Sequence, residues 1–335
     1  MSVLRWTTGR FEERGLATPR LDAEILIATA LGVARLQLYV QFDRPLGPDE
    51  LAAIRALVKR RQAGESVAYI VGRKEFFGLD FAVDARVLVP RPDTETLVDE
   101  AIARLRPRTP APAVDEGTAD GVSSPAQAAV EGSPFASDDT RADDDTIEAP
   151  PAVASPLVPA QPAAEVSPPP KVADIGTGSG AVIVTLGKRL PGLTLFAVDA
   201  SADALAVARA NAARHGVAIT FLEGDLDAPL APFAPFALIV ANLPYIPTGD
   251  LATLAPEVLA EPRLALDGGA DGLDLVRRLC AAAPRLLIAG GALALEVGAG
   301  QADAVATFCR EAGLVDVQLR RDLGAVDRVV SAKKP

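Results

Sequence analysis

The sequence has few of the residues that commonly bind metals or form disulfides. Among 335 residues there are two cysteines and one histidine. Cys280 and Cys309 lie in segments expected to be helical, without a Cys-x-x-Cys pair or a nearby histidine. We expect two buried thiols, no disulfide and no metal site. The one histidine, His215, precedes a glycine at a predicted helix end, where we expect it to favour the helix dipole or to face water.

Long apolar runs are also missing from the sequence. The start, Met-Ser-Val-Leu-Arg-Trp, has no apolar run of signal-peptide length. The uncharged segment 286–295 is too short to cross a bilayer, and it contains two adjacent glycines. We therefore expect a cytoplasmic protein with no membrane partner.

The acidic charge is concentrated in one segment. The chain has 44 acidic and 33 basic residues, a net charge of −11, and residues 107–170 hold 11 of the acids with only two arginines. The same 64 positions contain 13 prolines and nine Val, Ile, Leu or Phe residues, too few apolar side chains to offset the entropy of ordering. We expect a disordered, acidic, Pro- and Ala-rich insert here. The rest is nearly neutral, so charge alone neither indicates nor excludes a nucleic-acid partner.

Residues 1–67 are expected to form a small helical domain. Leu21, Ile25 and Ala28 recur at helical spacing, and Pro48 suits the first turn of another helix. The domain contains no catalytic cluster. It is either a packing module or a surface that selects a macromolecular partner, and the sequence pattern leaves both interpretations open.

Residues 68–106 are expected to form a β-hairpin and a connector. Apolar residues alternate with other residues over 77–83, which predicts a half-buried strand, and 86–89 is expected to be a further strand that ends at Pro90. Asp93 is expected to cap a helix that runs to about residue 105. The proline-rich turn before this helix either connects two elements or forms a wall of a ligand site.

Strands and helices alternate over residues 171–335. Strands are expected at 172–174, 193–198, 219–222, 236–241, 292–297, 315–319 and 328–331, and helices at 181–190, 201–214, 271–283 and 301–312. This alternation predicts an α/β domain with an open, mostly parallel sheet of seven strands, covered by helices on both faces.

The segment 172–199 has the pattern of a nucleotide-binding βαβ unit. A strand ends on Asp174, glycines follow at 176, 178 and 180, and the next strand ends on Asp199. Glycines let backbone N–H groups approach a ligand closely, and an acid about 20 residues further on can accept both hydroxyls of a ribose. The glycine spacing also fits a dinucleotide. Asp174 would repel a pyrophosphate and suits a cationic ligand, which favours S-adenosylmethionine (SAM) over NAD.

A polar and aromatic cluster, Asn242-Leu243-Pro244-Tyr245, follows the strand at 236–241. Open α/β sheets bind ligands at the carboxyl ends of their strands. The side-chain oxygen of Asn242 and the backbone carbonyl of Leu243 could accept both hydrogens of a substrate amide. Pro244 restricts the turn, and Tyr245 offers a flat aromatic face. A strand-ending turn without a chemical role is the alternative.

Seven segments of the chain together match one family. They are Pro-Arg-Leu-Asp-Ala-Glu from residue 19, Tyr-Ile-Val-Gly from 69, Glu-Phe-Phe-Gly from 75, Val-Pro-Arg-Pro-Asp-Thr-Glu from 89, Asp-Ile-Gly-Thr-Gly-Ser-Gly from 174, Asn-Leu-Pro-Tyr-Ile from 242 and Glu-Pro-Arg-Leu-Ala-Leu-Asp-Gly-Gly from 261. Through these segments the chain resembles the HemK/PrmC protein-(glutamine-N5) methyltransferases, which methylate the glutamine of the Gly-Gly-Gln motif in class I peptide chain release factors. The resemblance covers everything except 107–170.

The resemblance implies a seven-stranded, Rossmann-like, class I SAM-dependent methyltransferase domain over 171–335 behind a helical substrate-recognition domain over 1–67. It also implies the roles of particular residues. The methionine end of SAM would lie on Gly176, Thr177, Gly178, Ser179 and Gly180, the ribose on Asp199, and the adenine beside Asp225 and Leu226, with Asn242 bordering the cofactor. The glutamine would be held, and its methylation catalysed, by Asn242, Leu243, Pro244 and Tyr245.

The resemblance further implies class I release factors as partners, no stable nucleic-acid binding and a monomeric enzyme. Two departures from the family pattern are present, because Leu243 replaces a proline and Leu226 stands where a large side chain is common. Asn-Leu-Pro-Tyr is also the form found in ribosomal RNA adenine dimethyltransferases. Methylation of ribosomal RNA adenine at N6 is therefore the alternative function, and it would require a basic surface for phosphates.

Overall fold

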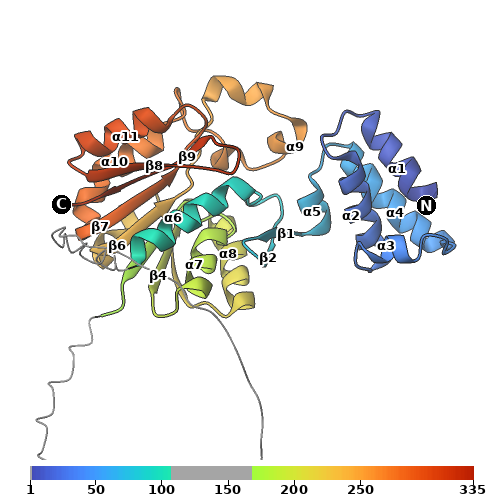
Figure 1. The fold of residues 1–335 in the computed structure, drawn as a ribbon, viewed down its shortest axis with the longest axis horizontal. Coiled ribbons are helices and arrows are strands. Elements are labelled where there is room, and N and C mark those ends of the chain that lie inside the picture. Colours follow the sequence, from blue (N-terminus) through green and yellow to red (C-terminus); the bar gives the residue numbers. More distant parts are fainter. Residues whose placement is uncertain (1, 107–167) are drawn as a thin grey trace, which may run out of the picture. The chain divides into compact units, whose positions relative to one another are not determined.

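The computed structural model describes residues 2–106 and 168–335 (Figure 1). The predicted disordered insert lies outside the described residues except for 168–170. Among the helices of the two described ranges, none has the combination of length and apolar character that crossing a bilayer requires.

The first part of the chain is helical and has a core of its own. Its elements are α1 (Ser2–Glu12), α2 (Pro19–Leu31), α3 (Gln37–Val40), α4 (Pro48–Gln62) and α5 (Val67–Val71). Prolines occupy the first turns of α2 and α4, as the sequence predicts, and Gly32 ends α2 in the left-handed conformation. Phe11, Leu26 and Ile54 are buried together in this core.

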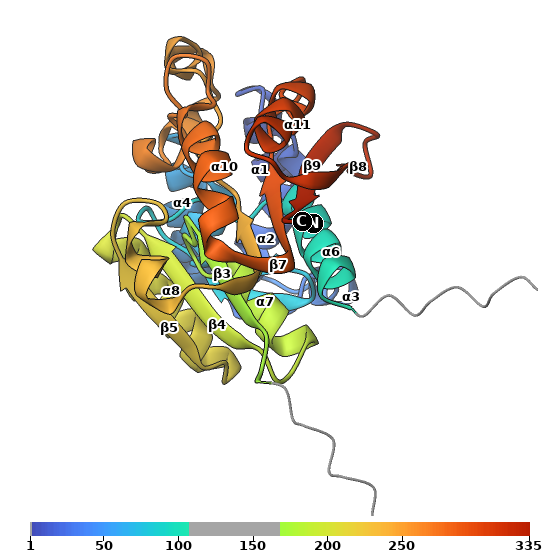
Figure 2. The same cartoon turned by 90° about the vertical axis from the view of Figure 1, so that its left-hand side faces the viewer.

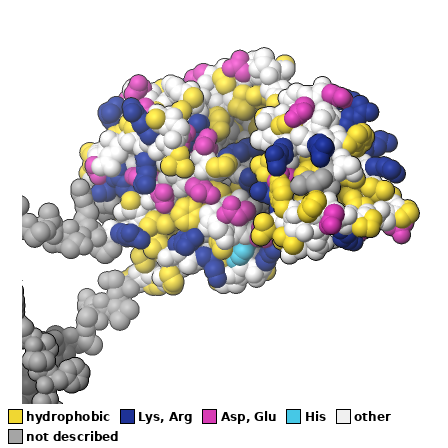
Figure 3. Space-filling model, turned by 45° about the vertical axis from the view of Figure 1, so that its right-hand side comes forward, with side chains coloured by type: hydrophobic (Ala, Val, Ile, Leu, Met, Phe, Trp, Pro, Cys, Tyr) yellow, Lys and Arg dark blue, Asp and Glu magenta, His cyan; other side chains and the backbone are white. Residues whose placement is uncertain are grey.

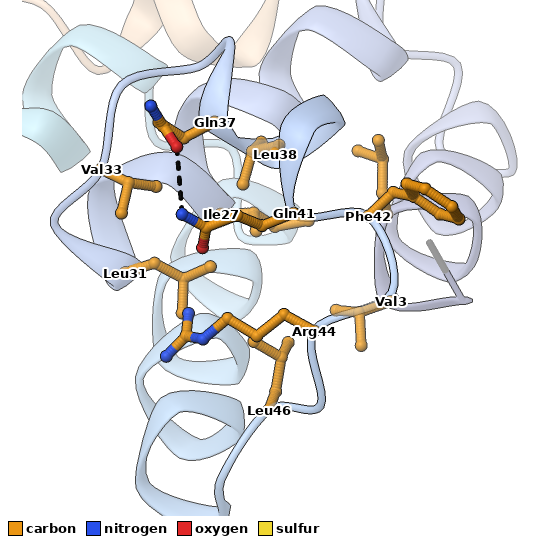
Figure 4. A pocket seen from close by; sticks show the side chains of 11 residues that line it. Val3, Ile27, Leu31, Val33, Gln37, Leu38, Gln41, Phe42, Arg44 and Leu46 are labelled. Carbon is orange, nitrogen blue, oxygen red and sulfur yellow. Dashed lines mark hydrogen bonds between the residues drawn. The ribbon is translucent and has the colours of Figure 1, made fainter.

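A hollow of about 60 Å³ opens in the helical region between α2, α3 and the segment that follows α3 (Figure 4). Leu31, Leu38 and Leu46 contribute to its apolar wall, and Gln41 Nε2 donates a hydrogen bond to Gln37 Oε1 at 3.0 Å. Pockets for small organic ligands usually measure roughly 300 Å³ or more. The hollow is therefore too small to be a ligand site.

A two-stranded antiparallel hairpin follows, formed by β1 (Arg73–Phe76) and β2 (Leu79–Ala82). The strand predicted over 77–83 is present as β2 but begins two residues later, because Phe77 and Gly78 form the turn between the two strands. Both have positive φ angles, of 53° and 78°. Glu95 Oε1 accepts a hydrogen bond from the Phe77 backbone N–H at 2.9 Å, which helps to hold the turn.

The predicted strand at 86–89 is absent from the structure. Val87 and Val89 are buried, but Val87 N–H donates to Asp84 O in a turn, and Tyr69 Oη donates to Val87 O. The prolines at 90 and 92 have no N–H to offer a sheet partner. The pattern of buried valines arises from packing alone.

The helix after this turn is α6 (Glu95–Leu105), which ends where the sequence predicted. Asp93 does not cap it. A short 3-10 turn, η1 (Pro92–Thr94), precedes α6, and Asp93 forms an ion pair with Arg328 at 3.3 Å. Near the other end of α6, Arg104 Nη1 pairs with Asp316 Oδ2 at 3.0 Å.

Seven strands form one mixed sheet. They are β3 (Lys171–Ile175), β4 (Thr194–Asp199), β5 (Ile219–Glu223), β6 (Phe236–Ala241), β7 (Leu287–Glu296), β8 (Val315–Arg321) and β9 (Asp327–Lys333). Their order is β5-β4-β3-β6-β7-β9-β8, and Figure 2 shows this order from left to right for the strands it labels. The β9 strand runs antiparallel to β7 and β8, and the other neighbours are parallel.

Helices cover both faces of this sheet. One face packs against α6, α7 (Ala181–Arg189) and α8 (Ala202–His215), which lie in front of the strands in Figure 1. The other packs against α10 (Asp274–Leu286) and α11 (Ala302–Glu311). The predicted α/β domain with seven strands is confirmed. The central strands β3 and β6 are apolar because both of their faces are buried.

Among the seven strands, the predicted and observed lengths differ most for β7. It begins at Leu287, not at 292, and its pairing with β6 shifts in register between Phe236 and Leu238. Gly290 has a φ of 73° at this irregularity. The two glycines interrupt the strand pattern in the sequence, although the chain continues through them as an irregular strand.

The two cysteines and the single histidine pack within the fold. Cys280 and Cys309 are buried free thiols with their sulfur atoms 3.8 Å apart. His215 is half-buried; its Nε2 donates to the backbone oxygen of Asp80 at 2.8 Å and its ring packs on Phe81. It therefore joins the end of α8 to the hairpin.

Asn211, on α8, joins the same hairpin to the segment before α7. Its Oδ1 accepts from Ala82 N at 2.8 Å, and its Nδ2 donates to Ala82 O at 3.0 Å and to Ser179 O at 2.9 Å. The side chain is fully buried. All three backbone groups would lose their partner if Asn211 were removed.

We expect Asn211→Ala to lower the free energy of unfolding by about 3 kcal/mol, because buried backbone groups lose their hydrogen bonds. Urea denaturation measures this change. The exposed neighbour provides the control, since Ala210→Ser should lower stability only by its helix-propensity cost, about 0.5 kcal/mol. Equal stability of Asn211→Ala and wild type would contradict the role assigned to this side chain.

Candidate active site

Sheet register brings four functional groups to one edge. Ile175 of β3 lies opposite Val198 of β4 and Ala241 of β6, and Ala241 lies opposite Leu295 of β7. The next residues along these strands are Gly176, Asp199, Asn242 and Glu296. Because the strands are parallel, their carboxyl ends meet at the same edge.

The glycine loop needs glycine at the positions that bend it. Gly176, Gly178 and Gly180 have positive φ angles of 73°, 53° and 80°. A Cβ on Gly176 would lie 3.1 Å from Leu243 Cδ2, so the loop can pass this closely only without a side chain. The loop therefore packs directly against the Asn-Leu-Pro-Tyr segment.

Asp174 lies buried beneath the glycine loop. Thr177 Oγ1 donates to its Oδ2 at 2.7 Å. Burial raises the pKa of Asp174 to about 7, and nearby Asp199 adds to the rise, while the Thr177 bond opposes it. A cationic group placed here would favour the ionised carboxylate.

Asp199 ends β4 with both carboxylate oxygens directed by backbone groups. Its Oδ2 accepts from Gly178 N and its Oδ1 from Ser201 N, each at 2.9 Å. Burial raises the pKa of Asp199. Each oxygen keeps a second lone pair, so the side chain can accept further hydrogen bonds from a ligand.

The main cavity measures about 240 Å³ and unites most of the predicted site residues. Eight of them line it: Gly176, Gly178, Asp199, Asp225, Leu226, Asn242, Leu243 and Pro244. Asp225 lies at its exposed side and forms an ion pair with Arg278 at 2.5 Å. Leu226 is buried and has a φ of 54°.

Two further hollows adjoin this cavity at Asn242. One, of about 50 Å³, is lined by Thr177 and Ser179 together with Asp174 and Arg91, so its wall carries both signs of charge. Gly180, which directly precedes α7, lines none of the three cavities. Its Cα instead faces Ala208 of α8.

The other hollow measures about 240 Å³ and contains Tyr245, the remaining predicted residue. Arg91, Val258 and Leu266 also form its wall. Asn242 borders all three spaces. A group bound in this hollow and a group bound in the main cavity would therefore meet at Asn242.

The backbone of the Asn-Leu-Pro-Tyr segment is held from both sides. Gln301 Nε2 donates to Tyr245 O at 2.9 Å, and Ile246 N–H donates to Leu266 O at 3.1 Å. Within residues 2–106 and 168–335, neither Asn242 Oδ1 nor Leu243 O accepts a hydrogen bond. Two acceptors on a rigid turn thus remain available for a ligand.

The proline-rich turn forms a wall of the site, which decides between the two interpretations of the sequence. Leu88 and Arg91 line the hollows around Asn242. Arg91 Nη2 pairs with Glu261 Oε1 at 2.6 Å. Burial raises the pKa of Glu261, and Arg91 opposes this rise. The sequence analysis did not place Arg91 or Glu261 in the site.

Thr94 and Glu296 were also missed. Asn242 Nδ2 donates to Thr94 Oγ1 at 3.1 Å. Glu296 is 2% exposed at the end of β7, and burial raises its pKa to about 7. A carboxylate directly after an apolar strand, in Leu-Ala-Leu-Glu, is the signal that could have identified it, because this strand ends beside β6.

The fold and the site together define a Rossmann-like methyltransferase. The strand order, the glycine loop after β3 and the acid that ends β4 are the features that carry this assignment. A family model described as "Methyltransferase domain" matches residues 172–261, and one described as "PrmC N-terminal domain" matches residues 2–72.

Similar proteins identify the family. The chain is 41% identical to the release factor glutamine methyltransferase of Geobacter sulfurreducens over 99% of this chain and 95% of that protein. It is 38% identical to the protein of the same name from Chlorobaculum tepidum, over 99% and 96% of the two chains. The chain belongs to the release factor glutamine methyltransferase family, which confirms the resemblance found in the sequence.

Solved structures match a smaller part of the chain. A ribosomal protein L11 methylase from Lactobacillus delbrueckii subsp. bulgaricus is 21% identical, with 51% of this chain and 73% of that chain covered and a TM-score of 0.38.

The raised pKa of Asp174 predicts how the stability of the ligand-free protein depends on pH. The folded state keeps a proton on Asp174 up to about pH 7, whereas the unfolded chain releases it near pH 4. Stability from this group is therefore lost as pH rises from about 4 to 7.

We expect Asp174→Asn to reduce this loss, measured by urea unfolding at pH 5 and pH 7.5. Glu296 contributes in the same direction, so part of the slope should persist in the variant. Asp250→Asn, at an exposed position, is the control. A slope identical in Asp174→Asn and wild type would contradict the prediction.

Proposed function

We propose that this protein transfers a methyl group from SAM to the side-chain amide nitrogen of the glutamine in the Gly-Gly-Gln motif of class I peptide chain release factors. Membership of the family supports the reaction and the substrate. The observation that carries the proposal is the pair of unused acceptors, Asn242 Oδ1 and Leu243 O, at the meeting point of the cavities.

The residues around the main cavity fit SAM. Asp199 would accept the ribose hydroxyls, and Asp225 and Leu226 would border the adenine. Gly176 to Ser179 would hold the methionine end, and Gly180 would only shape the loop. The neighbouring hollow has Asp174 and Arg91 in its wall, which are suited to the ammonium and the carboxylate of an amino acid.

SAM supplies an electrophilic methyl group on a sulfonium when it is bound. The protein must orient a weak nucleophile, since the lone pair of a carboxamide nitrogen is delocalised into its carbonyl. Asn242 Oδ1 and Leu243 O would accept the two amide hydrogens, which enriches the nitrogen and fixes its direction. Tyr245 would pack on the planar amide, and Pro244 keeps the turn stiff. Orientation of this kind can lower a barrier by about 7–11 kcal/mol.

Leu243 is compatible with this role. The family's proline at this position contributes a backbone carbonyl, and leucine has the same carbonyl. The Leu243 side chain is buried against Gly176, so it also helps to pack the glycine loop. The substitution therefore changes packing and leaves the acceptor in place.

The alternative substrate, ribosomal RNA, finds less support. On the face seen in Figure 3, Lys and Arg side chains lie singly or in small groups among acidic and hydrophobic ones. Two basic residues of α4 are engaged in ion pairs, Arg60 with Glu65 and Arg61 with Asp22. Arg61 is also 5% exposed at its side chain, so it is not available to a phosphate.

We further propose that the helical region selects the release factor. Buried Arg61 pairs with Asp22 of α2 at 2.7 Å and with Glu257 at 2.6 Å. Glu257 is the second residue of the short helix α9 (Pro256–Leu259), and Val258 of the same helix lines the hollow proposed to hold the glutamine. A protein bound to the helical region would thus lie close to α9, which Arg61 joins to this region and which also lines the substrate hollow.

We expect Asn242→Ala to abolish methyl transfer while SAM still binds, because Asn242 acts mainly on the substrate amide. Asp199→Ala should weaken SAM binding itself, since it removes the ribose acceptors. Calorimetry with SAM, run beside a methylation assay, separates the two effects. Equal losses of SAM affinity in both variants would contradict the assigned roles.

The substrate can be tested directly with labelled SAM. Purified class I release factor and, in a separate reaction, ribosomal RNA are incubated with the full-length protein, and mass spectrometry locates the methyl group. We expect methylation of the Gly-Gly-Gln glutamine and none on RNA. A methyl group found only on RNA adenine would replace the proposal with the alternative.

A further inference from the structure

The carboxamide of Asn242 has two ends of nearly equal size, and only one of them serves the proposed reaction. An oxygen that faces the substrate can accept a hydrogen bond from the glutamine amide. An NH2 group in the same place would put a donor against a donor. The side chain therefore needs neighbours that distinguish its two ends, and Thr94 and Glu296 lie against it.

The sheet fixes Glu296 beside Asn242. Ala241 of β6 is paired with Leu295 of β7, so Asn242 and Glu296 are the next residues along two neighbouring parallel strands. On its other side, Glu296 is paired with Val329 of β9. Neighbouring strands therefore hold its backbone on both sides, and its buried side chain lies beside the end of β6.

Glu296 has unused capacity to accept hydrogen bonds. Its Oε2 is buried and has no hydrogen-bond partner in the described part of the chain. Donor groups of Thr94 and Asn242 oppose the pKa rise that burial causes, as does the positive charge of Arg328, while Asp93 adds to the rise. The carboxyl group thus lies beside both the Asn242 amide and the Thr94 hydroxyl group.

The Thr94 hydroxyl group determines which groups donate and which accept in these hydrogen bonds. Asn242 Nδ2 donates to Thr94 Oγ1 at 3.1 Å. A hydroxyl group has a single hydrogen, and accepting from Asn242 leaves that hydrogen to be donated elsewhere. Glu296, which has no hydrogen to donate once it is ionised, is the neighbouring acceptor. The order of donation then runs from Asn242 through Thr94 to Glu296.

We propose that Thr94 and Glu296 are positioning residues that hold the Asn242 amide with its Oδ1 toward the substrate. When Glu296 is ionised and the Thr94 hydroxyl donates to it, the reverse orientation would leave Asn242 Oδ1 facing two acceptors, the Thr94 oxygen and the carboxylate. The consequence for catalysis rests on the proposed function, whereas the orientation itself can be measured without a reaction.

The small number of asparagines makes the side-chain NH2 signal of Asn242 easy to resolve and assign. The chain has only two asparagines, Asn211 and Asn242. Protein labelled with ¹⁵N in asparagine therefore gives two side-chain NH2 groups in a proton–nitrogen NMR spectrum, and Asn242→Ala assigns them. Asn211, whose Nδ2 donates to two backbone oxygens, is an internal control in the same sample.

Two matched pairs of variants test the orientation. Thr94→Val removes the hydroxyl at constant shape and Thr94→Ser keeps it; Glu296→Leu removes the acceptor and Glu296→Gln keeps one. We expect hydrogen exchange of the Asn242 amide to accelerate about tenfold in Thr94→Val and Glu296→Leu, in line with the loss of one hydrogen bond. The conservative variants should stay near wild type, and the Asn211 signals should not move. An Asn242 amide unchanged in both disruptive variants overturns the inference.

Kinetics test the consequence for the reaction. With release factor as substrate, we expect Thr94→Val to lower kcat about tenfold or more while the KM for release factor and the SAM affinity stay nearly constant. Thr94→Ser should restore kcat. A wild-type kcat in Thr94→Val would overturn the catalytic part of the inference. Inactivity of the wild-type protein toward release factor would instead overturn the proposed function, and the NMR result would still decide the orientation.

Discussion

The parallel register of β3, β6 and β7 is the constraint on which the site depends. Because these strands end at the same level, the glycine loop, the Asn-Leu-Pro-Tyr segment and Glu296 meet at one edge. The hydrogen bonds that hold the strands also fix the positions of these groups to a fraction of a side-chain length. Orientation of a weak nucleophile needs such a rigid support, since small misplacements are costly.

The same edge concentrates carboxyl groups where burial penalises their charge. Asp174, Asp199, Glu261 and Glu296 all have pKa values above their ordinary range, and burial is the largest cause for each. Perturbed acids cluster at functional sites because their placement is selected for chemistry at the expense of stability. Asp199 lines the main cavity and Asp174 the adjoining hollow, and of the four acids only Glu261 forms an ion pair within the described part of the chain.

Much of this arrangement could be predicted from the sequence. Strand-length apolar runs followed by turn residues predicted all seven strands, and the glycine loop and Asn242 identified the cavity. The missed residues, Arg91, Thr94 and Glu296, come from other parts of the chain. Their role depends on tertiary contacts, namely a proline-rich turn folded over the edge and a strand that follows a crossover helix. No local pattern encodes the contacts of Arg91 and Thr94, whereas the carboxylate at the end of the apolar strand is a signal for Glu296.

The errors in the predicted strands at 77–83 and 86–89 also arose from tertiary contacts. Phe77 continues an alternating pattern, yet it lies in a turn that Glu95, 18 residues away, helps to hold. Val87 and Val89 have the composition of a strand but pack without a sheet partner. The periodicity of a sequence reports which side chains are buried, and it does not report whether the backbone finds a neighbouring strand.

The route of the chain between α6 and β3 has a consequence for how this protein can vary during evolution. The start of α6 lies near Asn242, at the edge where the parallel strands end, whereas Arg104 near its other end contacts Asp316, at the level where these strands begin. The described chain stops just after α6 and resumes just before Lys171, the first residue of β3. Additions or deletions between these points enter the fold on the side remote from the chemistry. The length of the intervening segment can therefore change without displacing the edge at which β3, β6 and β7 end.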